Sequence, residues 1–268
     1  SGGWLNSVKV VLGLLELALA MKFLSNADLV VQAHIITREV FLVVWIVVFL
    51  MMTFYLLGWI RFSHDSKIEF LSIPRAMMAM LSLSFVIYLL PGLWGAPLKI
   101  ISGFPPPKHY SESPKGVGLE ANITIASNGE GNAVVGDQSG HCPHGLNCFL
   151  DYDEALEYAK EVNKPLMVDF TGHACVNCRK MEDEVWSDPG VLEILRNDVV
   201  LVSLYVDEYT DLPKEEQIEV TIGDRTKTLK TIGNKWSYLQ ASRYGTNSQP
   251  YYVILDLEEN QLGPFAAY

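Results

Sequence analysis

Two cysteines, Cys175 and Cys178, have the residue type and spacing best suited to chemistry in this sequence. They form a C-x-x-C motif that follows a short apolar segment, residues 165–171, and opens a segment with helical character. The N-terminus of a helix carries a partial positive charge that stabilises a thiolate. We therefore predict that Cys175 is a nucleophile, and that Cys178, about one turn further on, attacks the resulting mixed disulfide and releases the partner.

Two carboxylic acids are placed to move protons for this pair. Asp169 lies inside the apolar segment, so we expect it to be buried and to have a raised pKa. A carboxyl group in that state could exchange a proton with Cys178. Glu182 follows Cys178 by four residues and Cys175 by seven, so it shares a helical face with both cysteines. A solvated position on that face is an equally good interpretation of Glu182.

A metal site is the main alternative for the motif. Zinc sites also use C-x-x-C but need a second pair of ligands, and no Cys or His follows Cys178. Ligands could come only from upstream, namely from His141, Cys142, His144 and Cys148. Those two upstream cysteines could equally pair with each other or stay free. A binding module in which C-x-x-C is only structural is a further alternative; our preferred prediction has no metal and no cofactor.

The segments around the motif indicate an α/β domain over residues 148–268. Their order is helix, strand, C-x-x-C helix, helix, strand, hairpin, helix and strand. We expect helices at residues 151–161, 188–197 and 236–244, strands at 165–171, 199–206 and 251–257, and a hairpin at 218–229.

The first part of the chain has the composition of a membrane region. Residues 40–60 and 76–98 contain no charged side chain, and each run is long enough to cross a hydrocarbon core of about 30 Å. Residues 8–24 are a weaker candidate, because Glu16 falls in the middle and would need a partner helix or a wet cavity. An amphipathic helix lying in the interface is the alternative for that segment. We predict that residues 1–102 cross the lipid bilayer as three helices, at about 6–24, 40–60 and 75–98.

Charge indicates the orientation and excludes one class of partner. The loop at 61–75 holds three basic residues and the loop at 25–39 holds one, so the positive-inside rule places the former in the cytoplasm. The chain after residue 100 is then outside the cytoplasm. Residues 112–268 carry a net charge of −14, which is unsuited to binding nucleic acid. Residues 103–147 are rich in Pro, Gly, Ser and Asn, and we expect a flexible linker there.

The order of the predicted elements resembles the thioredoxin fold, with Pro250 opening the strand after the C-x-x-C helix and its partner strand. In that family the matching proline is cis, faces the cysteines and helps to hold the substrate backbone. Three spans followed by such a domain, with Cys-Val-x-Cys-(Lys/Arg), resemble the C-terminal part of the DsbD family of thiol:disulfide interchange proteins. The resemblance implies that the site residues of the family correspond here to Cys175, Cys178, Asp169, Glu182 and Pro250.

The DsbD resemblance implies a protein-disulfide reductase of the bacterial inner membrane, with its C-terminal domain in the periplasm. Electrons in that family come through an upstream membrane relay and pass to periplasmic thiol–disulfide proteins, including disulfide isomerases and cytochrome c maturation proteins. The sequence departs from the family pattern at Ala174, where many members have an aromatic residue, and in residues 207–235, which resemble an insertion. It also stops before the family's last helix, and residues 1–141 hold no cysteine for a relay. We therefore expect either a fragment or a truncated relative that cannot relay electrons alone.

Overall fold

The chain forms two compact units, one built mainly from residues 1–129 and the other from residues 130–268. A computed structural model describes residues 2–62, 65, 70–113, 140–222 and 225–267. Residues 114–139, which make up most of the predicted linker, lie outside the described residues.

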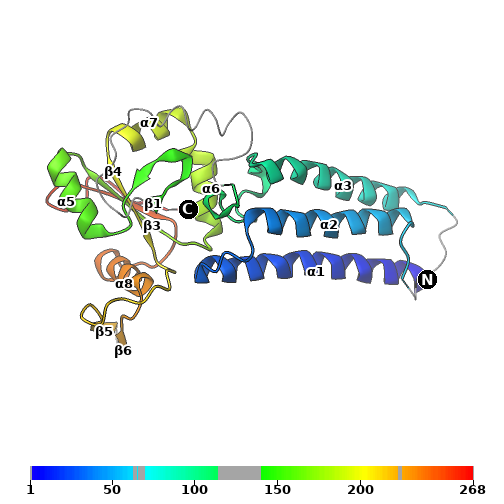
Figure 1. The fold of residues 1–268 in the computed structure, drawn as a ribbon, viewed down its shortest axis with the longest axis horizontal. Coiled ribbons are helices and arrows are strands. Elements are labelled where there is room, and N and C mark those ends of the chain that lie inside the picture. Colours follow the sequence, from blue (N-terminus) through cyan, green and yellow to red (C-terminus); the bar gives the residue numbers. More distant parts are fainter. Residues whose placement is uncertain (1, 63–64, 66–69, 114–139, 223–224, 268) are drawn as a thin grey trace. The chain divides into compact units, whose positions relative to one another are not determined.

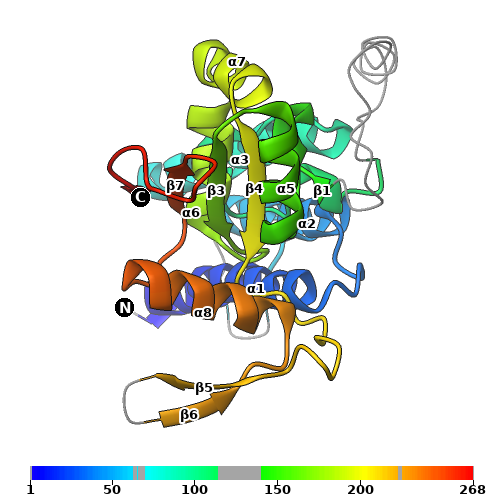
Figure 2. The ribbon, with the colours of Figure 1, turned by 90° about the vertical axis from the view of Figure 1, so that its left-hand side faces the viewer.

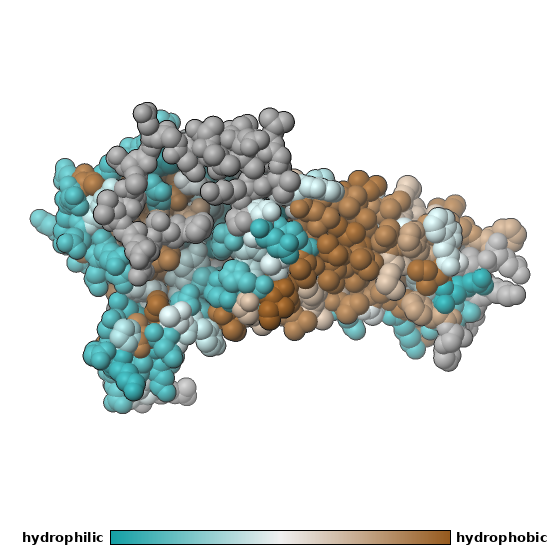
Figure 3. Space-filling view, in the orientation of Figure 1, coloured by the Kyte–Doolittle hydropathy of each residue, from teal (hydrophilic) through white to brown (hydrophobic). Residues whose placement is uncertain are grey.

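Three long helices lie side by side in the N-terminal unit (Figure 1): α1 (Gly2–Val31), α2 (Arg38–Leu57) and α3 (Ile73–Leu89), which the 3₁₀ turn η1 (Leu90–Trp94) extends. Buried apolar side chains from α1, α2 and α3, among them Ala18, Phe41 and Leu89, form their shared core. Apolar side chains also gather on the outside of these helices (Figure 3). By length and composition, α2 and the helix Ile73–Trp94 could each cross a membrane. The third predicted span, now inside the longer α1, stays a prediction.

The first residues assigned to the linker pack within the helical unit instead of running free. They follow the short 3₁₀ turn η2 (Lys99–Ile101) and include another, η3 (Lys108–Tyr110). Tyr110 is buried and its hydroxyl donates to Asp28 Oδ2 at 2.8 Å. Arg38 Nη1 donates to the carbonyl of Pro106 at 2.6 Å. Because these partners lie far upstream in the chain, composition alone did not reveal the packing.

A four-stranded sheet organises the C-terminal unit (Figure 2). Its order is β4-β3-β7-β8, with β3 and β4 parallel and the other neighbours antiparallel. The strands are β3 (Leu166–Thr171), β4 (Val200–Tyr205), β7 (Tyr251–Leu255) and the short β8 (Ala266–Ala267). The register places Asp169 opposite Ser203 on β4 and opposite Tyr252 on β7, so these three side chains share one face of the sheet.

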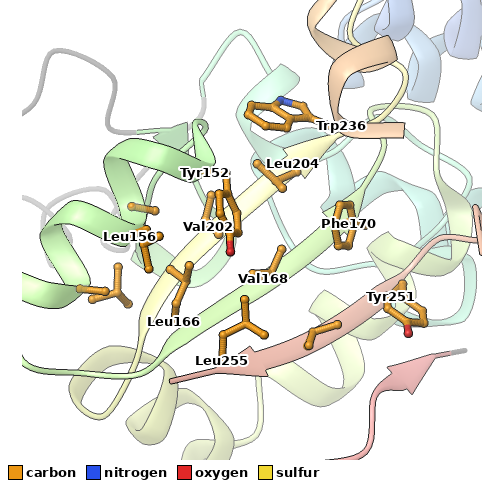
Figure 4. Close-up of a cluster of buried hydrophobic side chains, with 14 residues drawn as sticks. Tyr152, Leu156, Leu166, Val168, Phe170, Val202, Leu204, Trp236, Tyr251 and Leu255 are labelled. Carbon is orange, nitrogen blue, oxygen red and sulfur yellow. The ribbon is translucent and has the colours of Figure 1, made fainter. Parts of the chain in front are cut away.

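Helices cover both faces of this sheet. On one face, α5 (Tyr152–Val162) and α8 (Ile232–Tyr244) pack against alternate apolar strand residues, including Val168, Phe170 and Val202 (Figure 4). The other face, which carries Asp169, is covered by three helical segments: α6 (Val176–Met181), the π-helical turn η5 (Glu182–Trp186) and α7 (Pro189–Asn197). The site residues therefore lie between the sheet and the C-x-x-C helix.

Two small hairpins complete the unit. The predicted hairpin at 218–229 is confirmed as β5 (Glu219–Ile222) paired with β6 (Arg225–Thr228), although its tip lies outside the described residues. Upstream, β1 (Gly140–His141) pairs with β2 (Asn147–Cys148) around the 3₁₀ turn η4 (Pro143–Gly145). The helix α8 begins four residues earlier than the 236–244 expected, because the Thr231 side chain accepts the N–H of Asn234 and caps it there.

Candidate active site

Cys175 and Cys178 form a disulfide at the start of α6, with 5.3 Å between their Cα atoms. Cys175 is the N-cap residue, and its sulfur accepts the N–H of Cys178 at 3.1 Å. Cys178 is only 1% exposed, whereas Cys175 is half-buried. Cys175 is therefore the more exposed cysteine of the pair, and Cys178 is shielded.

The carboxylate of Asp207 fixes the loop that leads into the pair. Its two oxygens accept the backbone N–H groups of His173 at 2.8 Å and of Ala174 at 3.1 Å. A side chain at Gly172 would crowd this carboxylate, since an added Cβ would lie 3.0 Å from Asp207 Oδ2. The loop before Cys175 thus depends on an acid that follows the neighbouring strand β4.

His173 adds a polar contact beside the loop. Its ring stacks on Tyr205 with 4.1 Å between ring centroids, and its Nε2 lies 2.9 Å from Glu208 Oε2. The hydrogen bond from His173 is the largest cause that lowers the pKa of Glu208, to about 2. Glu208 is therefore ionised throughout the physiological range and anchors the imidazole.

Asp169 is buried on the sheet face beneath α6, as predicted. It is 2% exposed, and its Oδ2 accepts the Ser203 hydroxyl at 3.2 Å. Its Oδ1 is buried without a hydrogen-bond partner among the described residues. Burial raises the pKa of Asp169 to about 7, against the smaller opposing effects of the Arg179 charge and the Ser203 hydrogen bond. This carboxyl can therefore take up or release a proton near neutral pH.

Glu182 is buried as well, so the interpretation of a solvated helix face is wrong for it. Its Oε1 lies 2.7 Å from Arg179 Nη2, and each side chain of the pair is 7% exposed. Arg179 also donates to Thr171 Oγ1 at 3.2 Å. Burial raises the pKa of Glu182 in spite of the arginine, and the charge of Asp169 raises it further. Arg179 thus forms an ion pair with Glu182, and its charge also opposes the rise in the pKa of Asp169.

Pro250 lies at the end of β3 from which the loop to Cys175 departs. Tyr251 pairs with Phe170, so the residue before Tyr251 adjoins the last residue of that strand. Pro250 is buried and the Gln249–Pro250 peptide bond is cis, as the resemblance implied. Its contact with a substrate backbone stays a prediction.

Comparison with known proteins agrees with this architecture. Residues 147–256 match a protein family described as thioredoxin-like. The C-terminal unit contains a thioredoxin-like domain. Among solved structures, the chain is similar to one titled "DsbH Oxidoreductase", at 20% identity over 54% of this chain and 86% of that chain, with a TM-score of 0.32. It is also similar to a thioredoxin from Thermus thermophilus, at 26% identity over 44% of this chain and 69% of that one, with a TM-score of 0.28. A search of curated proteins finds no match.

The C-terminal unit contains a second disulfide, Cys142–Cys148, which the sequence left as one of several possibilities. All four sulfurs are thus paired in this state. Among the described residues, no group of three or more His, Cys, Asp or Glu side chains is arranged to hold a metal ion. The upstream cysteines adjoin the domain's sheet through β2 and are not part of a free linker.

Sequence reasoning missed three polar side chains of the domain: Arg179, Ser203 and Asp207. A signal existed for Ser203, the one polar residue in an otherwise apolar strand. For Arg179 the signal was Glu182, three residues further on, since that spacing allows an ion pair between the two side chains on one face of a helix. Nothing in the local sequence separates Asp207 from the other acids of its segment.

Proposed function

We propose that this chain is a membrane-anchored thiol–disulfide oxidoreductase that works as a protein-disulfide reductase. The observation that carries the proposal is the disulfide of Cys175 and Cys178 at a helix start, in which Cys175 is half-buried and Cys178 is buried. The buried Asp169, with a pKa raised to about 7, adds the proton carrier that such an exchange needs. The thioredoxin-like fold supports the same chemistry.

The exchange proceeds in two steps from the reduced pair. The Cys175 thiolate attacks one sulfur of an acceptor disulfide, forms a mixed disulfide and releases the other acceptor sulfur as a thiolate. Cys178 then transfers its proton to Asp169 and attacks the Cys175 sulfur, which releases the second acceptor thiol. The acceptor gains two electrons, and Cys175 and Cys178 return to the disulfide described above.

The anchor and the partners belong to the same proposal. The apolar lengths of α2 and the helix Ile73–Trp94 favour insertion into a lipid bilayer, which we take to be the bacterial inner membrane. The loop charges favour a periplasmic C-terminal domain. An upstream membrane relay would reduce the pair, and periplasmic thiol–disulfide proteins, such as a disulfide isomerase or cytochrome c maturation proteins, would be the acceptors. Protease protection in oriented membrane vesicles tests the orientation: digestion of residues 140–267 from the cytoplasmic side would overturn it.

Trapping of the mixed disulfide tests the chemistry. The full chain in detergent is first reduced with dithiothreitol, freed of the reductant and then mixed with insulin as the acceptor, for the wild type and for the Cys175→Ser and Cys178→Ser variants. We expect Cys178→Ser to accumulate a covalent adduct with insulin, because the first step remains and the second is lost. We expect no adduct with Cys175→Ser. Equal behaviour of the two variants, or unchanged insulin reduction by either, contradicts the proposal.

The direction of electron flow has its own measurement, the reduction potential of Cys175–Cys178. A value near that of thioredoxin, about −270 mV, supports a reductase, and a value near that of DsbA, about −120 mV, supports an oxidase. A variant with both Cys142→Ser and Cys148→Ser restricts the titration to the C-x-x-C pair.

A further inference from the structure

The second disulfide, Cys142–Cys148, lies on the same side of the sheet as the C-x-x-C helix. Cys148 is 3% exposed and packs in the cluster that contains Trp186 and Tyr252. Cys142 is half-buried at the edge of that cluster. The pair thus repeats the asymmetry of the first disulfide, in which one cysteine is half-buried and the other is buried.

A single hydroxyl group connects the sulfur of the half-buried Cys142 to the buried acid of the first site. Ser203 Oγ lies 3.6 Å from Cys142 Sγ and donates to Asp169 Oδ2 at 3.2 Å. The strand register fixes this arrangement, since Asp169 and Ser203 are paired across β3 and β4. A proton can therefore pass between Asp169 and Cys142 through Ser203, in either direction.

The loop that the disulfide closes is held by other contacts as well. His144 Nε2 donates to the carbonyl of Glu182 at 2.7 Å, and Arg196 Nη2 donates to the carbonyl of His144 at 2.9 Å. Leu146 is 4% exposed in the same apolar cluster as Trp186. Because these contacts do not depend on the S–S bond, breaking that bond leaves the loop in place and the two thiols close enough to pair again.

We propose that Cys142–Cys148 is a second thiol–disulfide exchange site of this domain, with a dithiol protein as its reductant and Cys142 as the sulfur that reacts. Ser203 and Asp169 act as positioning and proton-carrying groups for Cys142. The site is distinct from Cys175–Cys178, and its exchange does not require that pair.

The step balances as follows. A thiolate of the donor attacks Cys142 Sγ, the bond between the two cysteine sulfurs breaks, and its electron pair leaves on Cys148. The second donor thiol gives its proton to Cys148 and, now a thiolate, attacks the donor sulfur of the mixed disulfide. Cys142 leaves as a thiolate and receives a proton from Asp169 through Ser203; Asp169 regains one from solvent. The donor dithiol is oxidised to a disulfide, and the cysteine pair is reduced to two thiols.

The test removes the C-x-x-C cysteines, so that its outcome bears on the second exchange site and not on the proposed function of Cys175 and Cys178. In the full chain in detergent, the Cys175→Ser/Cys178→Ser variant is treated with dithiothreitol without denaturant, then alkylated in denaturant so that a shielded thiol is also labelled, and analysed by peptide mass. We expect both Cys142 and Cys148 to be labelled. If the pair remains oxidised under conditions that reduce Cys175–Cys178 in the wild type, the disulfide is structural and the proposal is wrong.

Single-cysteine variants on the same background test which sulfur reacts. With Cys148→Ser, the remaining Cys142 should form an adduct with oxidised glutathione; with Cys142→Ser, the shielded Cys148 should react at least about tenfold more slowly. Ser203→Ala should slow the Cys142 reaction by about tenfold or more at pH 7 and shift its pH profile upward. Ser242→Ala, an exposed serine on α8, is the matched control. Equal rates for the two cysteines, or no effect of Ser203→Ala, overturn the assignment.

Discussion

Replacing Asp169 with asparagine should make the domain more stable, and the gain should grow with pH. Burial holds the pKa of this carboxyl at about 7, against an ordinary value of 3.8. Between these two values the folded state retains a proton that the unfolded chain has lost, so the free energy of unfolding falls as the pH rises. A shift of about 3 pH units, at about 1.4 kcal/mol per unit, corresponds to about 4 kcal/mol. Asparagine carries no proton to lose, so the variant lacks this decline.

Pulse proteolysis in urea measures the effect on the oxidised full chain in detergent, with the C-terminal unit followed as its own band. The advantage of Asp169→Asn over the wild type should be small at pH 4 and should increase by about 4 kcal/mol by pH 8, because over most of this range the unfolded chain has lost the Asp169 proton while the folded state still holds it. Asp198→Asn, an exposed acid at the end of α7, is the control and should change little at either pH. Parallel pH profiles for Asp169→Asn and the wild type would refute the burial argument.

Three further substitutions test the frame around the site. Asp207→Ala removes two charged hydrogen bonds from the loop before the cysteines, so we expect a loss of about 2–4 kcal/mol in the same urea assay and slower insulin reduction, with a smaller loss for Asp207→Asn. Gly233→Ala should lower the free energy of unfolding by about 1–3 kcal/mol, although alanine favours helices, because its Cβ would lie 2.6 Å from the backbone oxygen of Glu208. Gly263→Ala is the control and should be near neutral, because no atom lies within contact distance of an added Cβ there. Thr231→Ala should cost about 1 kcal/mol through loss of the α8 cap, and Thr231→Ser should restore it.

Features that depend on neighbouring residues were predictable from the sequence. The strand expected at 165–171 is observed at Leu166–Thr171, and the hairpin lies within the range expected for it. The burial of Asp169 also followed from its apolar neighbours. Local periodicity and side-chain chemistry determine these features, so one sequence is enough to see them.

Features that depend on strand register were not predictable. Ser203 meets Asp169 only because β4 aligns with β3 residue by residue, and the sequence does not encode that alignment in any short motif. The hydrogen bond from Tyr110 to Asp28 depends likewise on the tertiary structure, because the two residues are far apart in the sequence. The disulfide between Cys142 and Cys148 also depends on the three-dimensional path of the chain. For the cysteines, spacing allowed pairing, metal binding or free thiols, and only the three-dimensional arrangement decided between them.

The π-helical turn after α6 keeps three side chains in line along the helix. Cys178, Glu182 and Trp186 follow one another at intervals of four residues, and all three are buried. In a continuous α-helix, each such interval overshoots a full turn by about 40°, so the third side chain would rotate away from the sheet. The wider turn at Glu182–Trp186 takes more residues per revolution and reverses that drift. Insertions or deletions there would leave the cysteines intact yet turn the tryptophan toward solvent, so homologues should conserve the length of this turn.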